Sequence, residues 1–122
     1  SGITGVQTTV PLMLDHVSKG RLSIQSLVDL LSYSPARIFG LINKGKIAVG
    51  YDADLTIVDL KAKNKILNSL IASKSGWTAY DGMEVIGWPI GTIINGSIVM
   101  KEGTLISKPF GQPYKFYETE YN

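Results

Sequence analysis

The fold of the second half of this chain is decided by residues 92–100, which read T-I-I-N-G-S-I-V-M. Two runs of apolar and β-branched side chains flank the pair Asn95-Gly96. Asparagine and glycine both tolerate the positive φ of a type I′ turn, whose twist matches that of the strands it joins. The sequence therefore predicts a two-residue β-hairpin here.

Further strands and turns are predicted on the N-terminal side of this hairpin. After Gly45, turn residues become frequent, and residues 54–59 alternate between apolar and polar side chains, which predicts a half-buried strand. Residues 61–65 have the composition of an exposed turn, and residues 67–72 are compatible with a strand or a helix. Residues 77–82 are predicted to form a loop.

On the C-terminal side, residues 101–103 predict a turn that leads into a strand at 104–106. We expect residues 107–122 to form an ordered tail that lies on a surface, because this segment holds several aromatic side chains: Phe110, Tyr114, Phe116 and Tyr117.

The first forty residues are predicted to be helical. Thr8 and Thr9 are typical capping residues, Pro11 is tolerated in a first helical turn, and Lys19-Gly20 would end the helix. Ser23 would cap a second helix, with one apolar stripe facing a core: Ile24, Leu27, Val28, Leu30 and Leu31.

A third short helix is predicted to begin with Ser34 as its cap and Pro35 in its first turn, and to end at Gly40. Helices followed by strands give an α+β fold class.

Composition narrows the range of functions. The chain has 122 residues, of which 44% are hydrophobic and 18% charged, so either its surface is somewhat apolar or another part of the protein covers it. A net charge of +2 without basic clusters argues against nucleic acid and membrane surfaces as partners. The absence of cysteine excludes disulfides and thiolate metal sites. Without a signal-like or membrane-spanning segment, we expect a cytoplasmic protein.

Few side chains in this sequence suggest chemistry. His16 is the single histidine, and its neighbour Asp15 would point ~100° away from it on a helix, so a structural or surface role is favoured. Asp52 and Asp54 would share one face of a strand, where paired carboxylates can act in acid–base chemistry or bind a cation. Their alternative roles, which we favour, are as a turn residue and a strand-start residue.

Several segments together resemble class I dihydroorotases of the cyclic amidohydrolase superfamily. Residues 1–12, S-G-I-T-G-V-Q-T-T-V-P-L, are similar to that family's S-G-I-x-G-x-E-T-x-x-P-L, with Gln7 in place of glutamate. Residues 34–41, S-P-A-R-I-F-G-L, are similar to N-P-A-R-x-F-G-L. Residues 50–59 resemble G-x-D-A-D-L-x-x-x-D, and residues 73–82, S-K-S-G-W-T-A-Y-D-G, favour dihydroorotase over hydantoinase.

The resemblance implies a composite architecture. The family folds as a metal-binding (β/α)₈ barrel with a small β-sandwich built from both chain ends. Residues 1–44 would then be the C-terminal end of the barrel, comprising the loop after the last strand and the closing helices. Residues 45–106 would be a portion of the sandwich, and residues 107–122 an aromatic C-terminal tail.

The resemblance also implies a function for the parent protein, of which this chain would be a C-terminal piece. That function is the zinc-dependent interconversion of carbamoyl-aspartate and dihydroorotate in de novo pyrimidine biosynthesis. The family's metal ligands and catalytic aspartate have no counterparts here, so we expect no catalytic or metal-binding residue and no activity from this chain alone. Ser1 and Gly2 match substrate-binding positions that act largely through backbone groups.

The implied partners are the small-molecule substrate, further copies of the parent and, as a candidate, aspartate transcarbamoylase. Three alternatives stay open: a hydantoinase or dihydropyrimidinase, a non-catalytic dihydroorotase-like scaffold protein, and a free-standing α+β binding module.

Overall fold

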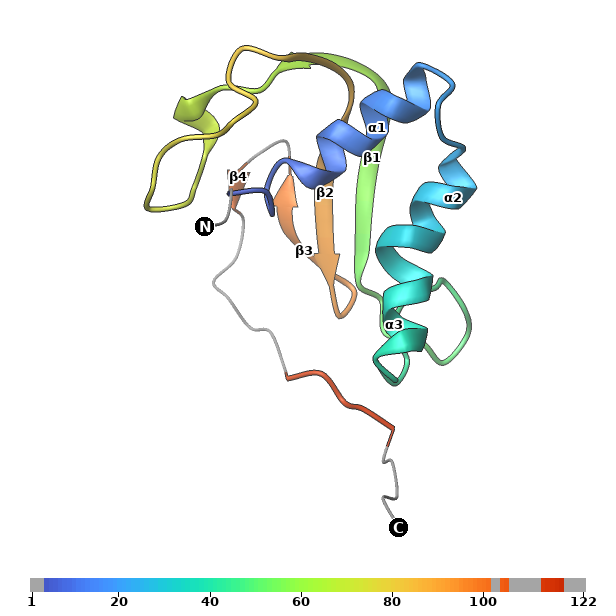
Figure 1. Ribbon diagram of the computed structural model, residues 1–122. Coiled ribbons are helices and arrows are strands. Elements are labelled where there is room, and N and C mark those ends of the chain that lie inside the picture. Colours follow the sequence, from blue (N-terminus) through green and yellow to red (C-terminus); the bar gives the residue numbers. More distant parts are fainter. Residues whose placement is uncertain (1–3, 102–103, 106–112, 118–122) are drawn as a thin grey trace. The chain divides into compact units, whose positions relative to one another are not determined.

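The computed structural model describes residues 4–101, 104–105 and 113–117. Helices come first along the chain and strands follow (Figure 1), so the two kinds of element are segregated as in the α+β class. The elements are α1 Thr9–Ser18, α2 Ile24–Val28, a π-helical turn Asp29–Tyr33, α3 Ser34–Ile38, β1 Leu55–Lys65, a 3₁₀ turn Asn68–Leu70, β2 Glu84–Ile94, β3 Ser97–Lys101 and β4 Thr104–Leu105.

The strands form one sheet in the order β1-β2-β3-β4. Strands β2 and β3 pair antiparallel, with Ile94 opposite Ser97, and a bulge lies between Thr92 and Ile93. The turn that joins them has φ of 49° at Asn95 and 79° at Gly96. These two angles confirm the predicted hairpin, and β4 then pairs antiparallel with β3.

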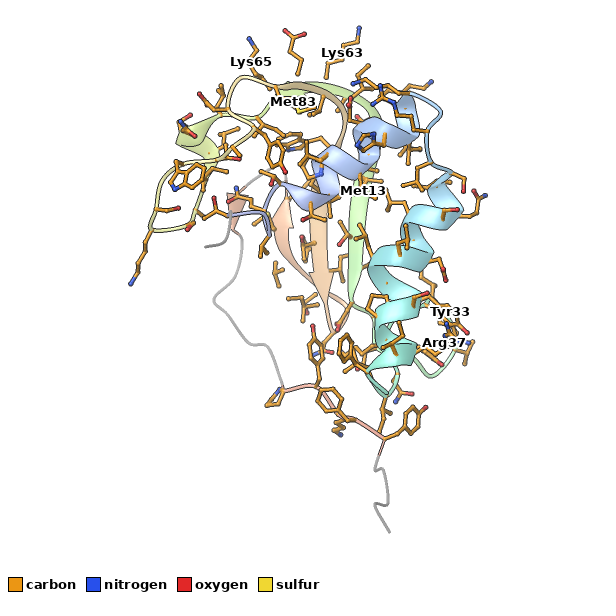
Figure 2. The ribbon with its side chains drawn as sticks, viewed as in Figure 1. Met13, Tyr33, Arg37, Lys63, Lys65 and Met83 are labelled. Atoms are coloured by element: carbon orange, nitrogen blue, oxygen red, sulfur yellow. The ribbon has the colours of Figure 1, made fainter. Side chains whose placement is uncertain are left out.

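Strand β1 differs from its prediction in length and in pattern. The sequence predicts a turn at residues 61–65, but these residues continue the strand to Lys65. Lysines at alternating positions are compatible with a strand at the sheet edge, because long charged side chains reach solvent and discourage pairing with other chains. Figure 2 shows Lys63 and Lys65 pointing outward from this end of β1. The sequence also predicts that buried and exposed side chains alternate over residues 54–59. This prediction is wrong, because the partly buried positions of β1 are Leu55, Val58 and Ala62.

Contacts divide the chain into two compact units. The first contains the described residues up to Ile24 together with Val58–Pro89, and the second contains Gln25–Ile57 together with the described residues from Ile90 onward.

In the first unit, α1 packs closely on the backbone of β2. Leu14, Ile66 and Val85 form its buried apolar core. Gly87 has a φ of +104°, and a Cβ added there would lie 2.7 Å from the Leu14 Cβ atom. A side chain at position 87 would therefore push the helix away from the strand.

The start of α1 confirms the predicted helix but not the predicted capping. The Thr8 side chain makes no cap hydrogen bond to the helix. Instead, the hydroxyls of Thr8 and Thr9 donate to the Gly5 carbonyl, at 3.3 and 2.7 Å. The backbone N–H of Thr9 donates to the same carbonyl at 3.0 Å, so Gly5 is held against the first helical turn.

In the second unit, the predicted third helix is present as α3, but Ser34 is not the cap of a separate helix. Val28, Tyr33 and Ser34 all have right-handed helical angles, so the helical path continues from α2 through the π-helical turn into α3. A proline cannot donate to the carbonyl four residues earlier, and a π-helical turn accommodates this missing bond. The Ser34 hydroxyl donates to the Asp29 carboxylate at 3.1 Å instead of capping a helix.

The apolar stripe of this helical segment is also less buried than expected. Leu27 and Ala36 are buried, whereas Val28, Leu30 and Leu31 are exposed. The prediction that the whole stripe faces a core is therefore wrong for this chain, in which no described segment covers those three side chains.

The described part of the C-terminal tail pairs with the loop after α3. The Ile42 N–H donates to the Lys115 carbonyl at 2.8 Å, and the Tyr117 N–H donates to the Gly40 carbonyl at 2.7 Å. Leu41 and Phe116 form an antiparallel bridge. For residues 113–117 the backbone thus pairs with this loop, while the side chains of Tyr114, Phe116 and Tyr117 stay more than half exposed. Phe110 lies outside the described residues, and the predicted strand 104–106 lies within them only in part.

Candidate functional site

The two predicted substrate-binding residues, Ser1 and Gly2, lie outside the described residues. The segment that follows them is well connected. The Thr4 hydroxyl donates to the Trp77 carbonyl at 2.8 Å. The Gln7 side-chain amide bonds to the backbone of Leu70 and Ala72. This segment is therefore fixed to the loop between β1 and β2 within the first unit.

Asp15 is a carboxylate whose burial the sequence did not reveal. It is only 2% exposed. Its Oδ1 atom accepts the Ile86 backbone N–H at 3.0 Å, and its Oδ2 atom accepts the Lys19 ammonium at 2.6 Å. The hydrogen bond from Lys19 holds the pKa of Asp15 below its ordinary value, against the opposing effect of burial. A signal in the sequence was its place in an apolar stretch, since Leu14 precedes it and Val17 follows two residues later.

His16 does not share a site with Asp15. The two oxygen atoms of Asp15 already accept hydrogen bonds, and the His16 Nδ1 atom lies 3.3 Å from the Arg21 guanidinium. A guanidinium at that distance disfavours a metal ion on the same nitrogen. The structure therefore agrees with a structural or surface role for His16.

Asp52 and Asp54 come together around a lysine in the second unit. The Lys44 ammonium lies 3.0 Å from the Asp52 carboxylate and also contacts the Asp54 carboxylate. Hydrogen bonds to these carboxylates, that to Asp54 first, raise the pKa of Lys44. The Lys44 hydrogen bond likewise lowers the pKa of Asp54, whose Oδ1 atom accepts the Asn95 N–H at 2.9 Å.

The two carboxylates and Lys44 therefore have a structural role, and we call these three residues the joint. Asp54 directly precedes β1 and binds the backbone of the β2–β3 turn, so the strand-start interpretation agrees with the structure. A cavity of about 770 Å³ borders the joint, and the Tyr114 ring centroid lies 5.7 Å from the Lys44 ammonium. The ammonium occupies the position that a bound cation would take between the two carboxylates.

The described residues do not fit a zinc ion. Within residues 4–101, 104–105 and 113–117, no group of three or more His, Cys, Asp or Glu side chains could hold a metal. The carboxylates of Asp15 and Asp54 already bind lysines and backbone amides.

Among the residues that the structure describes, none of the helices has the length and hydropathy of a membrane span.

The chain is similar to known proteins over most of its length. Residues 2–99 match the Amidohydrolase family. The chain is 45% identical to the dihydroorotase of Pyrococcus furiosus over 112 residues, which are 92% of this chain and 27% of that protein. It is 40% identical to the L-hydantoinase of Paenarthrobacter aurescens over 115 residues, or 92% of this chain and 25% of that protein.

Among solved structures, an L-hydantoinase (dihydropyrimidinase) from Arthrobacter aurescens superimposes with a TM-score of 0.85 and 38% identity. That match covers 88% of this chain and 24% of the other. The chain thus spans about a quarter of the length of the relatives that it matches.

Proposed function

This chain belongs to the amidohydrolase family, and we propose that it is part of a dihydroorotase, which interconverts carbamoyl-aspartate and dihydroorotate in pyrimidine biosynthesis. The observation that carries the proposal is 45% identity to a dihydroorotase across 92% of the chain. The motif S-K-S-G-W-T-A-Y-D-G at residues 73–82 supports the same choice.

A cyclic-amide hydrolase of the hydantoinase type is the second candidate. It is supported by 40% identity to an L-hydantoinase and by the TM-score of 0.85 against an L-hydantoinase structure. Both candidates open a ring amide, so they differ in substrate rather than in the class of reaction.

Within such an enzyme, we propose that residues 1–44 form the end of a (β/α)₈ barrel and residues 45–106 a portion of a β-sandwich, followed by the aromatic tail 107–122. The order of the elements, helices up to Ile38 and strands from Leu55, supports this division. Ser1 and Gly2 would contribute backbone groups to the substrate pocket.

We propose that the parent enzyme binds zinc through residues outside this chain, and that the chain alone is inactive. The support is that the best-placed carboxylates, Asp15 and Asp54, are already engaged by lysines and by backbone N–H groups. Substituting such a carboxylate should therefore weaken the fold rather than the chemistry. We further propose that the parent is cytoplasmic and forms a homo-oligomer. Aspartate transcarbamoylase is its candidate protein partner.

The test compares this chain with its full-length parent. Both are assayed for hydrolysis of dihydroorotate and of hydantoin, and their zinc content is measured. We expect zinc and dihydroorotate turnover in the parent, and neither in the chain. Hydantoin turnover without dihydroorotate turnover would favour the second candidate, and turnover of either substrate by these 122 residues alone would overturn the proposed role.

A further inference from the structure

The turn between β2 and β3 carries the one Asn-Gly pair of this sequence, Asn95-Gly96. An asparagine that precedes glycine is prone to deamidation, because the next backbone nitrogen attacks the side-chain amide and glycine has no side chain to hinder the approach. Both residues are exposed, so water and hydroxide reach them. The turn therefore holds every group that this modification needs.

The reaction is balanced without a cofactor. The Gly96 nitrogen gives its proton to solvent hydroxide and forms a bond to the Asn95 side-chain carbon Cγ. The bond from this carbon to the side-chain nitrogen breaks, and ammonia leaves with a proton taken from water. A second water molecule then opens the five-membered imide at one of its two carbonyl carbons. The product is an aspartate or an isoaspartate at position 95.

The structure holds both backbone nitrogens of this turn in hydrogen bonds. The Gly96 N–H donates to the Ala53 carbonyl at 3.0 Å, and the Asn95 N–H donates to the Asp54 Oδ1 atom at 2.9 Å. Figure 1 shows the turn next to the start of β1, the strand that Ala53 and Asp54 precede. The attacking nitrogen is thus bound as a donor and must be released by local opening before it loses its proton.

The joint holds Asp54 ready to accept this turn. The Lys44 ammonium contacts the Asp54 carboxylate and favours its charged form, which is the stronger acceptor for the Asn95 N–H. Asp52 contacts the same ammonium at 3.0 Å. Within the described part of the chain, however, the Asp52 carboxylate makes no hydrogen bond to the turn. The two carboxylates therefore differ in their hold on Asn95.

We propose that Asn95 is a deamidation site that the joint controls: Asp54 protects it while it binds the turn, and loss of this contact exposes Asn95 to modification. The product would not restore the turn. An isoaspartate lengthens the main chain by one carbon between Ile94 and Ser97, which are paired across the hairpin. An aspartate adds a negative charge to the residue that Asp54 binds. This modification goes beyond the proposed function and does not depend on which ring amide the protein hydrolyses.

The test uses the full-length protein that contains this chain, incubated at mildly alkaline pH both folded and in guanidinium chloride. Peptide mapping by mass spectrometry follows the mass increase of an amide converted to an acid at Asn95, and chromatography separates the isoaspartyl peptide. Hydrogen exchange at the Gly96 amide reports opening of the turn. Asn43 is an internal control, because it is exposed and has a φ of 58° but precedes a lysine.

The decisive variant is Asp54→Ala, and its matched control is Asp52→Ala, which removes the other carboxylate of the joint. Exchange at the Leu41 amide, which donates to the Ala36 carbonyl at 2.8 Å in the same unit, shows whether the fold is intact. If Asp54→Ala fails this check, Asp54→Asn takes its place, since it keeps an acceptor oxygen but loses the charge. Gly96→Ala tests the chemistry itself in guanidinium chloride.

We expect Asn95 to deamidate at least about 10-fold more slowly in the folded wild type than in guanidinium chloride. Asp54→Ala should speed deamidation and Gly96 exchange in the folded protein by about 10-fold, the effect of losing one hydrogen bond to a charged group, and Asp54→Asn by about 3-fold. Asp52→Ala should stay within about 2-fold of the wild type in both measurements. Gly96→Ala should slow the reaction in guanidinium chloride, because the new methyl group hinders the attack, and Asn43 should stay unmodified over the same period.

Three results would overturn the inference. Equal rates in the folded and unfolded wild type would mean that the turn gives no protection. An unchanged rate in the folded Asp54 variant, or an equal rise in Asp52→Ala, would remove the controlling role of Asp54. Absence of conversion in guanidinium chloride would remove the site itself. None of these measurements uses enzyme activity, so they are independent of the substrate assignment.

Discussion

The Asp15 carboxylate accepts a hydrogen bond of 3.0 Å from the backbone N–H of Ile86, a residue 71 positions further along the chain. This bond joins α1 to the beginning of β2 inside the first unit. Because Asp15 is 2% exposed, water cannot replace either partner easily, and the contact should contribute measurably to the stability of the fold.

Substitution of Asp15 by alanine should leave the Ile86 N–H without its acceptor and Lys19 without its carboxylate. We expect a loss of about 2–3 kcal/mol in the free energy of unfolding, the cost of an unsatisfied buried polar group. The Asp15→Asn variant would keep an acceptor for Ile86 and should lose less stability. Urea unfolding of the wild type, Asp15→Ala and Asp15→Asn measures the difference, and equal stability of the two variants would contradict this account.

The pH dependence of stability should carry the signature of Asp15. Its pKa in the folded protein lies below the ordinary value of 3.8, chiefly because of the Lys19 hydrogen bond. A depressed folded pKa means that the unfolded chain binds the proton more readily. The stabilisation is therefore fully present above pH 3.8 and is lost as the pH falls through the lower folded value.

Unfolding free energies measured between about pH 2 and pH 6 would test this. The Asp15→Asn variant should show a smaller loss of stability on acidification than the wild type. The Asp54 carboxylate, whose pKa is lowered by Lys44, adds a loss of the same sign that remains in the variant. Identical pH profiles for the two proteins would argue against the assigned role of Asp15.

Substitution of Gly87 by alanine should destabilise the first unit for two reasons. Its φ of +104° is unfavourable for any residue with a Cβ, and the new methyl would lie 2.7 Å from the Leu14 Cβ atom. Overpacking of this kind costs about 1–3 kcal/mol. Gly82→Ala is the matched control, because Gly82 has a φ of +82° with no atom within 4 Å of an added Cβ.

The comparison of these two glycine variants separates backbone strain from steric overlap. Thermal unfolding should show a larger decrease in Tm for Gly87→Ala than for Gly82→Ala. A similar decrease in both would mean that strain alone, and not the close approach of α1, determines the need for glycine at position 87.

Asp52 and Asp54 should differ in their importance although both contact Lys44. Asp54 also accepts the Asn95 N–H at 2.9 Å, whereas the Asp52 side chain is 42% exposed and contacts Lys44 at the surface. We expect Asp54→Ala to cost about 1–2 kcal/mol and Asp52→Ala about 0–1 kcal/mol in unfolding free energy.

Denaturant titrations of the two variants at low and high salt would measure this. The Asp52→Ala effect should shrink in high salt, because a surface ion pair is screened, while the Asp54→Ala effect should persist through its backbone hydrogen bond. A larger effect of Asp52→Ala would contradict the strand-start role of Asp54.

Patterns that depend on neighbouring residues were predicted well from the sequence. The hairpin at 92–100 follows from Asn95-Gly96, and α1 follows from Pro11 near its start and Lys19-Gly20 at its end. The strand end at 61–65 was missed, because the composition of lysine and asparagine suggests a turn when the edge position of the strand is unknown. The helical path through Ser34-Pro35 was missed because a π-helical turn has no strong local signature.

By itself, the sequence determined the α+β order, the hairpin and the family of this chain, since these depend on local backbone preferences and on ordered motifs. Only the tertiary structure decided how its polar side chains are used. Hydrogen bonds join Asp15 to Ile86, Gln7 to Leu70 and Ala72, and Asp54 to Asn95. The bonded residues are 41 to 71 positions apart in the sequence. Such pairings require the chain to have folded, because a side chain's partner is set by which segments pack together and not by its neighbours in sequence.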